Sequence, residues 1–262
     1  MANRLALAFV IFIACIMQKM MFSAIKTTMP SIVPFYADDL FLEMDRTLLG
    51  GIDAWEITHL FSAYIPADLA GFIYVTAWVL FILFFPTLLV MFDNNIERRN
   101  RYLVMYFWVW FGLGHILALA FMSAGPVFYD QVYGGNTFAS LTAALQSSGV
   151  STSFVGQIQR DLWTGYSTME QTASSGISAF PSVHIGNAML FGLYLYEVAP
   201  KLWPVSVVYL IVYQFLSVYL GWHYAVDGIA SAILVYALWK YLKVREARKQ
   251  QAVPASDDAI YS

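Results

Sequence analysis

Charged residues are scarce in this chain of 262 residues: Asp, Glu, Lys and Arg make up 12%, whereas hydrophobic residues make up 60%. Soluble domains usually contain about 25% charged residues, so an ordinary soluble fold is not expected. The chain has a single cysteine, Cys15, which excludes a disulfide within the chain and argues against a cysteine-based metal site. Internal repeats and low-complexity runs are also missing, so we expect one domain.

Long apolar runs replace the missing charge. A helix needs about 20 mostly apolar residues to cross a bilayer. Six segments meet this requirement: 5–25, 71–92, 102–122, 182–198, 204–221 and 224–242. We therefore predict an all-α fold, a polytopic membrane helix bundle with six transmembrane helices. The first apolar run is too long for a signal peptide, so we expect it to remain in the protein as a span.

Basic residues predict how the bundle is oriented. They gather at the N-terminus, between the second and third spans, and after the last span. Because cytoplasmic segments of membrane proteins are enriched in Lys and Arg, we expect both termini in the cytoplasm. Six spans require the same arrangement, which leaves the loops 26–70 and 123–181 outside the cytoplasm. We interpret residues 1–243 as one membrane domain that holds the candidate catalytic residues, and residues 244–262 as a cytoplasmic polar tail.

His223 and Asp227 form the first motif with useful chemistry. They are four residues apart, so on a helix both side chains would occupy one face. The carboxylate can accept a hydrogen bond from one imidazole nitrogen and leave the other nitrogen to attack a phosphorus atom. Asp227 lies in an apolar segment, where an unpaired charge is costly, and His223 is its nearest candidate partner. A purely structural pair that fixes a helix end is the alternative.

The second motif ends at His184. Pro181 suits the first turn of a helix, and Ser178 is a candidate N-cap. The backbone N–H groups of Ser182 and Val183 would then form a phosphate site at the helix N-terminus. His184 would stand beside this site, where it can protonate a leaving oxygen. A structural helix start with a histidine close by is common, so this alternative also stays open.

The chain contains Pro181-Ser182-x-His184, then Tyr219-Leu220-Gly221-x-His223-Tyr224 and Asp227. Together these motifs resemble those of the type 2 phosphatidic acid phosphatase superfamily, over about residues 102–240. The resemblance implies a six-span fold with both motifs on one membrane face. It also implies that His223 is the nucleophile, His184 the acid–base residue and Asp227 the group that orients His223. It implies chemistry that needs no metal and no other cofactor.

Departures from the superfamily pattern are also informative. Typical members carry an early lysine with an Arg-Pro pair, and an arginine six residues before the nucleophilic histidine. This chain has no Arg-Pro pair, Ser217 stands at the arginine position, and Val183 replaces the usual glycine. The cations that clamp a phosphomonoester, with its charge of about −2, are thus missing from their usual positions. A phosphodiester carries one negative charge, so we expect transfer of a phospho-headgroup between lipids.

The same pattern is similar to the subgroup that contains fungal inositol phosphorylceramide synthase. The segment Ser123-Ala124-Gly125-Pro126 also resembles that subgroup, and we expect Gly125 and Pro126 to line the site; a helix ended by Gly-Pro is the alternative. Lys19, in the first span, is a candidate phosphate-facing cation, with snorkelling to the interface as the alternative. Four acidic residues in the first outer loop suggest either a cation site or a solvated loop, and we expect the latter: Asp38, Asp39, Glu43 and Asp45.

We predict an integral-membrane lipid phosphotransferase that moves a phospho-headgroup from a phospholipid donor to a lipid alcohol through a phosphohistidine intermediate. With water as the acceptor, the same site would be a hydrolase. The alternative is therefore a lipid phosphate phosphatase that acts on phosphatidic acid or a polyprenyl pyrophosphate. A non-catalytic lipid-binding protein is a third hypothesis, which the intact histidines and aspartate argue against. We expect a bacterial inner membrane, a site that faces the periplasm, and no nucleic-acid partner.

Overall fold

The computed structural model describes residues 2–168 and 176–252. Within these ranges every regular element is a helix, and no strand occurs. The structure therefore confirms the all-α prediction for the described part of the chain.

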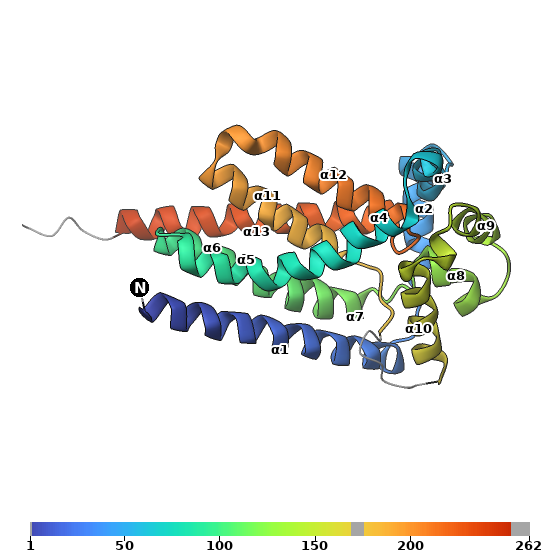
Figure 1. The fold of residues 1–262 in the computed structure, drawn as a ribbon, viewed down its shortest axis with the longest axis horizontal. Coiled ribbons are helices and arrows are strands. Elements are labelled where there is room, and N and C mark those ends of the chain that lie inside the picture. The colour runs from blue at the N-terminus through green and yellow to red at the C-terminus, as the bar shows by residue number, and fades with distance from the viewer. Residues whose placement is uncertain (1, 169–175, 253–262) are drawn as a thin grey trace, which may run out of the picture.

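All six predicted spans are helical. They correspond to α1 (Ala2–Ile32), the continuous segments Ala67–Phe92 and Ile96–Ala120, α11 (Val183–Val198), α12 (Trp203–Tyr219) and α13 (Ala225–Ala252). The segment Ala67–Phe92 joins α4 (Ala67–Gly71) to α5 (Trp78–Phe92), and Ile96–Ala120 joins α6 (Ile96–Trp108) to α7 (Ala118–Ala120); a π-helical stretch connects each pair. These helices run side by side along the long axis of the molecule (Figure 1).

Five helices in the described ranges are long and apolar enough to cross a membrane. The sixth, α11, has 16 residues and is shorter than the length of about 20 that a full crossing needs. It packs between α12 and α13, and much of its surface is buried. The count of six spans and the cytoplasmic termini therefore stay predictions.

The two ends of the bundle differ. The start of α1 and the C-terminal part of α13 lie at one end (Figure 1). The opposite end holds the short helices α2 (Asp38–Leu48), α3 (Ala54–His59), α8 (Pro126–Tyr133), α9 (Ala139–Ser147) and α10 (Phe154–Thr168). These helices belong to the two segments predicted as outer loops, so both loops lie at the same end of the bundle.

Helix boundaries differ from the prediction at two places. α1 continues to Ile32 and contains Pro30 within its last turn, so Lys26 lies in the helix and not in a loop. α13 continues to Ala252, so the first part of the predicted tail is helical. The rest of that tail, and residues 169–175 of the second outer loop, lie outside the described residues.

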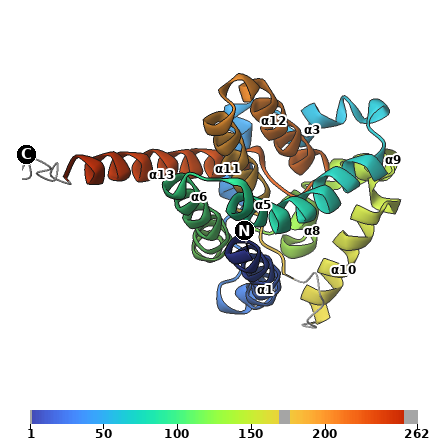
Figure 2. The same cartoon turned by 60° about the vertical axis from the view of Figure 1, so that its left-hand side comes forward.

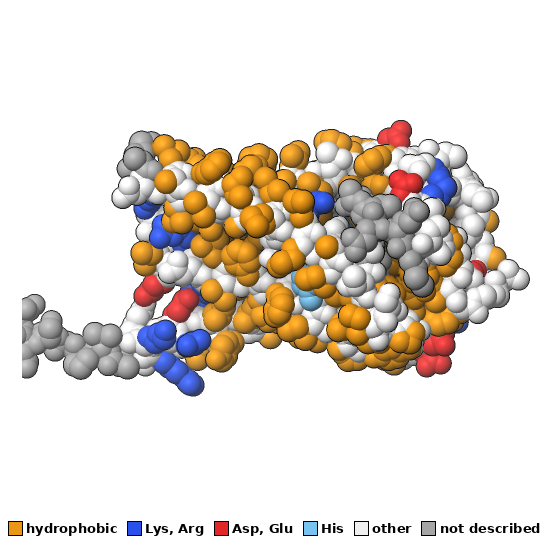
Figure 3. Space-filling view, turned by 90° about the horizontal axis from the view of Figure 1, so that it is seen from below, with side chains coloured by type: hydrophobic (Ala, Val, Ile, Leu, Met, Phe, Trp, Pro, Cys, Tyr) orange, Lys and Arg blue, Asp and Glu red, His pale blue; other side chains and the backbone are white. Residues whose placement is uncertain are grey.

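The outer surface of the bundle is apolar. Figure 3 shows hydrophobic side chains over the middle of one face and most of the charged side chains at its two ends. α1 lies at the edge of the bundle, where it packs on α5 (Figure 2), and its exposed side chains include Phe9, Met17 and Met20. A band of exposed apolar side chains between two charged ends is what a bilayer solvates, so the surface supports a membrane setting.

Candidate active site

The His223–Asp227 pair forms where the chain turns between α12 and α13. Gly221, with φ of +73°, allows the turn, and His223 follows it before α13 begins at Ala225. The distance from His223 Nδ1 to Asp227 Oδ2 is 3.1 Å, and the Asp227 side chain is fully buried. The predicted contact is therefore present. The predicted reason was wrong, because His223 precedes the helix and does not share a helical face with Asp227.

Asp227 fixes the hydrogen-bonding state of His223. The same carboxylate oxygen accepts the backbone N–H of Tyr224 at 3.1 Å. A buried carboxylate with no proton can only accept, so His223 donates its Nδ1–H and keeps a lone pair on Nε2. Burial lowers the pKa of His223, and the positive charge of Lys26 lowers it further. The imidazole is therefore neutral, which is the state in which a histidine nitrogen can act as a nucleophile.

Ser182 connects the two motifs. Its hydroxyl lies 3.3 Å from His223 Nε2, and its backbone N–H donates to the carbonyl of Asp227 at 3.3 Å. Ser182 is also the N-cap of α11, since its side chain accepts the N–H of Ile185. The prediction of Ser178 as the N-cap was therefore wrong. Pro181 comes before the N-cap, so it lies outside α11 and not in its first turn.

His184 lies in the first turn of α11, as predicted. Its ring is stacked between Tyr74 and Trp78, at centroid distances of 4.1 Å and 3.9 Å. The centres of the His184 and His223 rings are 6.4 Å apart. The two aromatic neighbours hold the His184 imidazole in place, so both histidines have defined positions.

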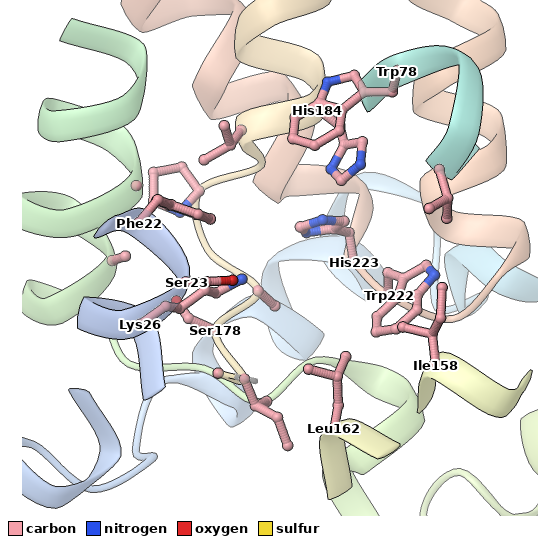
Figure 4. A pocket seen from close by; sticks show the side chains of 18 of the residues that line it. Phe22, Ser23, Lys26, Trp78, Ile158, Leu162, Ser178, His184, Trp222 and His223 are labelled. Atoms are coloured by element: carbon pink, nitrogen blue, oxygen red, sulfur yellow. The ribbon is translucent and has the colours of Figure 1, made fainter. Parts of the chain in front are cut away.

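Both histidines line one cavity of about 230 Å³ (Figure 4). The predicted residues Lys19 and Val183 also line it. Figure 4 shows Lys26 and Ser178 on one side and Trp222 with α10 side chains on the other. Most of the lining is apolar or aromatic, and no carboxylate contributes to it among the described residues. The cavity thus combines an apolar wall with a positively charged corner.

Four other predicted residues lie next to the cavity without lining it. Ser182 and Gly125 stand behind the histidine motif, and Pro126 borders a separate void of about 10 Å³ beside His223. The Ser217 hydroxyl donates to the carbonyl of Gln214 at 2.8 Å, and its own carbonyl accepts the N–H of His223 at 3.3 Å. Ser217 is fully buried against its own helix, so its side chain does not replace a phosphate-binding arginine.

Gly125 supports the histidine motif from behind. Its φ is +86°, and a Cβ at this position would lie 2.5 Å from the carbonyl oxygen of Trp222. The segment of Ser123 to Pro126 therefore packs directly on the backbone that precedes His223. Only glycine combines this conformation with this close approach.

Sequence reasoning missed the role of Asp38. The prediction of a solvated acidic loop is wrong for this residue, which is fully buried. Its carboxylate accepts hydrogen bonds at 2.8 to 3.1 Å from the hydroxyls of Ser123, Tyr133 and Tyr224 and from the N–H groups of Ala124 and Gly125. Asp38 thus connects α2 to the Gly125 segment and to the residue after His223. The donors are 85 to 186 residues away in sequence, so no local pattern could reveal them.

Asp45 was also expected in solvent and is buried. Its carboxylate accepts the N–H groups of Ala225 and Val226, at 2.7 Å and 2.9 Å, and so caps α13. Burial raises the pKa of Asp45 to about 6, with a smaller contribution from the negative charge of Asp227, while the two N–H groups oppose the shift. Asp45 therefore fixes the start of the helix that carries Asp227.

The fold and the site together define a class of protein, an integral-membrane helix bundle with a histidine-based site. His223, which is paired with Asp227, lines one cavity together with a second histidine and two lysines. A family model of the PAP2 superfamily matches residues 39–241 of the chain. Because the match covers most of the 262 residues, the chain belongs to the PAP2 superfamily. The resemblance that the motifs carry is thereby confirmed.

The chain is also similar to the inositol phosphorylceramide synthase catalytic subunit AUR1 of Saccharomyces cerevisiae, with 35% identity over 78 residues. The aligned segment covers 30% of this chain and 20% of the yeast protein, so the similarity concerns a small part of the relative. No solved structure matches the chain. Family membership and this similarity are consistent with the predicted subgroup and indicate a lipid phosphotransferase or phosphatase in a membrane.

Proposed function

We propose that the protein transfers a phospho-headgroup from a phospholipid to a lipid alcohol, with His223 as the nucleophile. The observation that carries the proposal is the orientation of His223. Its Nδ1 is held by Asp227, its Nε2 carries the lone pair, and its ring lines the cavity together with His184. The similarity to a yeast phosphorylceramide synthase subunit supports transfer between lipids.

In the first step Nε2 of His223 attacks the phosphorus of the donor. An N–P bond forms, the P–O bond to the lipid alcohol breaks, and His184 gives a proton to the departing oxygen. The phospho-headgroup then stays on His223, and Asp227 stabilises the positive charge that develops on the imidazole. In the second step His184 takes the proton of the acceptor hydroxyl, whose oxygen attacks the phosphorus and breaks the N–P bond.

The cavity wall favours a lipid acceptor over water. Aromatic and aliphatic side chains, among them Phe22, Trp110, Trp222 and Leu162, contribute to it. Such a wall binds lipid chains and lowers the local concentration of water, which competes for the phosphohistidine. Hydrolysis of a phosphomonoester is the second candidate function. It would need Lys19 as well as Lys26 to balance the second negative charge, and both lysines line the cavity.

We also propose where the site lies. Residues 1–243 act as one catalytic domain in the inner membrane of a bacterium, with the cavity on the periplasmic side and the tail 244–262 in the cytoplasm. The support is the positive-inside rule together with the position of α13's basic end beside the N-terminus, opposite the outer helices.

Transfer is tested with purified protein in mixed micelles that contain a phosphate-labelled phospholipid and a lipid alcohol. We expect label in a new lipid phosphodiester, and none with the His223→Ala variant. Release of inorganic phosphate from phosphatidic acid, without a new phosphodiester, would instead establish the phosphatase.

A further inference from the structure

Lys26 lies near the end of α1 and lines the same cavity as His184 and His223 (Figure 4). Its ammonium group is 5.6 Å from the centre of the Phe22 ring, and none of the ion pairs between described residues includes it. A lysine charge at an apolar cavity without a carboxylate neighbour is costly. An anion bound in the cavity would remove that cost.

The positive charge of Lys26 acts on His223, the proposed nucleophile. Together with burial, this charge lowers the pKa of His223. Lys19 is seven residues earlier, which places it about 10 Å away along the axis of α1 and further into the bundle. A phosphate group at His223 Nε2 therefore has Lys26 as its neighbouring lysine.

Two other positions that could have supplied a cation, residues 160 and 217, do not do so. Arg160 is exposed and donates to the carbonyl of Ser151 at 2.6 Å and to Gln157 at 2.7 Å. It does not line the cavity. The position six residues before His223 holds the buried Ser217. Among the described residues, Lys19 and Lys26 are thus the cations that line the cavity, and Lys26 is the one whose charge acts on His223.

Gly176 fixes the position of Lys26. A Cβ at Gly176 would lie 2.7 Å from both the carbonyl carbon of Lys26 and the nitrogen of Thr27. The chain that leads to the Pro181 motif therefore contacts the backbone of α1 directly at Lys26. At Gly114, similarly, a Cβ would lie 2.6 Å from the Phe22 ring. The turns of α1 that contain Phe22 and Lys26 therefore pack closely against the segments that form the site, although the opposite surface of α1 is exposed.

We propose that Lys26 binds the phosphate of the donor lipid and makes the site select singly charged phosphodiesters over phosphomonoester dianions. Lys19 also lines the cavity but lies about 10 Å further along α1, so one ammonium stands beside a phosphate at His223. It balances one negative charge, whereas a dianion there would keep a net negative charge against an apolar wall. The selectivity rests on the proposed function, because it concerns the donor of that reaction. Lys26 lies before residue 39, where the PAP2 superfamily match begins, so the family match does not assign it.

Binding of orthovanadate, a phosphate mimic, tests the inference without knowledge of the lipid. We expect calorimetric titration in detergent to show binding weakened about tenfold or more by Lys26→Gln, the cost of one charge-assisted hydrogen bond, and largely kept by Lys26→Arg. Arg160→Gln removes a positive charge at the same end of the bundle and should bind as the wild type does. Thermal unfolding of each variant confirms that the fold is intact. Wild-type affinity in a folded Lys26→Gln variant would overturn the inference.

Kinetics separate this inference from the proposed function. With whichever of phosphatidylinositol, phosphatidylethanolamine and phosphatidylglycerol the wild type uses, we expect Lys26→Gln to raise KM about tenfold and to change kcat less. Phosphatidic acid should be the poorer substrate of the wild type. If transfer occurs but KM is unchanged in Lys26→Gln, the inference fails while the proposed function stands. If no phospholipid is transferred and orthovanadate binding still depends on Lys26, the function fails while the phosphate site stands.

Discussion

The substitution Asp38→Asn tests whether a buried carboxylate holds the active-site backbone in place. The side chain keeps its size, but one carboxylate oxygen becomes an NH2 group that can only donate. If that group replaces Oδ2, the Ala124 N–H and the Tyr133 hydroxyl lose their acceptor. If it replaces Oδ1, three donors lose theirs: the Ser123 hydroxyl, the Gly125 N–H and the Tyr224 hydroxyl.

The magnitude follows from these contacts. A hydrogen bond to a charged group contributes about 1.5–3 kcal/mol, so the loss of two such bonds lowers the free energy of unfolding by about 3–6 kcal/mol. We also expect a lower kcat, because the Gly125 segment supports the backbone before His223. The assays are thermal unfolding in detergent and the lipid transfer reaction at saturating donor.

Asp39→Asn is the matched control. Asp39 is the next residue along α2, it is exposed, and its carboxylate accepts a hydrogen bond from the Tyr129 hydroxyl. We expect this variant to lose about 1 kcal/mol or less. Equal stability and equal kcat in the two variants would refute the role assigned to Asp38.

Three further predictions concern neighbouring residues. Asp227→Asn should fold and bind donor but lower kcat by about 10³–10⁴-fold in the transfer assay, because the wrong His223 tautomer is held; a wild-type kcat would contradict the pairing. Gly125→Ala should lower both the melting temperature and kcat, since its Cβ would meet the Trp222 carbonyl, and unchanged values would show that this contact is absent. The raised pKa of Asp45, 3.8 to about 6, means that its stabilising contribution is complete below about pH 4 and lost as pH rises through about 6. Asp45→Asn should therefore flatten the pH dependence of unfolding between about pH 4 and 7, and an identical slope would count against the raised pKa.

The helices of the bundle could be predicted because the signal of a membrane helix, a continuous run of apolar residues, is local in the sequence. Each predicted span is a run of apolar residues, and the structure has a helix over every one. The ends were harder: hydropathy falls at Lys26, but α1 continues because backbone hydrogen bonding does not stop at a polar side chain. A hydropathy limit therefore placed Lys26 in a loop and hid its position beside the cavity.

The site could be predicted only in part, because sequence patterns report local features and not contacts between distant residues. His184, His223 and Asp227 are found from short motifs, because their spacing along the chain carries the signal. Asp38 and Asp45 act through partners far away in sequence, so composition suggested a solvated loop while both carboxylates are buried. A contact between residues this far apart in the chain produces no periodic pattern in the sequence, so the sequence alone does not predict it.

Trapping the covalent intermediate tests the central claim most directly. Protein is incubated with phosphate-labelled donor without acceptor, quenched, and digested to locate the label. The account predicts an acid-labile label on the fragment that contains His223, which moves into lipid when a lipid alcohol is added and never forms in His223→Ala. Transfer that proceeds in His223→Ala, with no label on the wild-type protein, would contradict it.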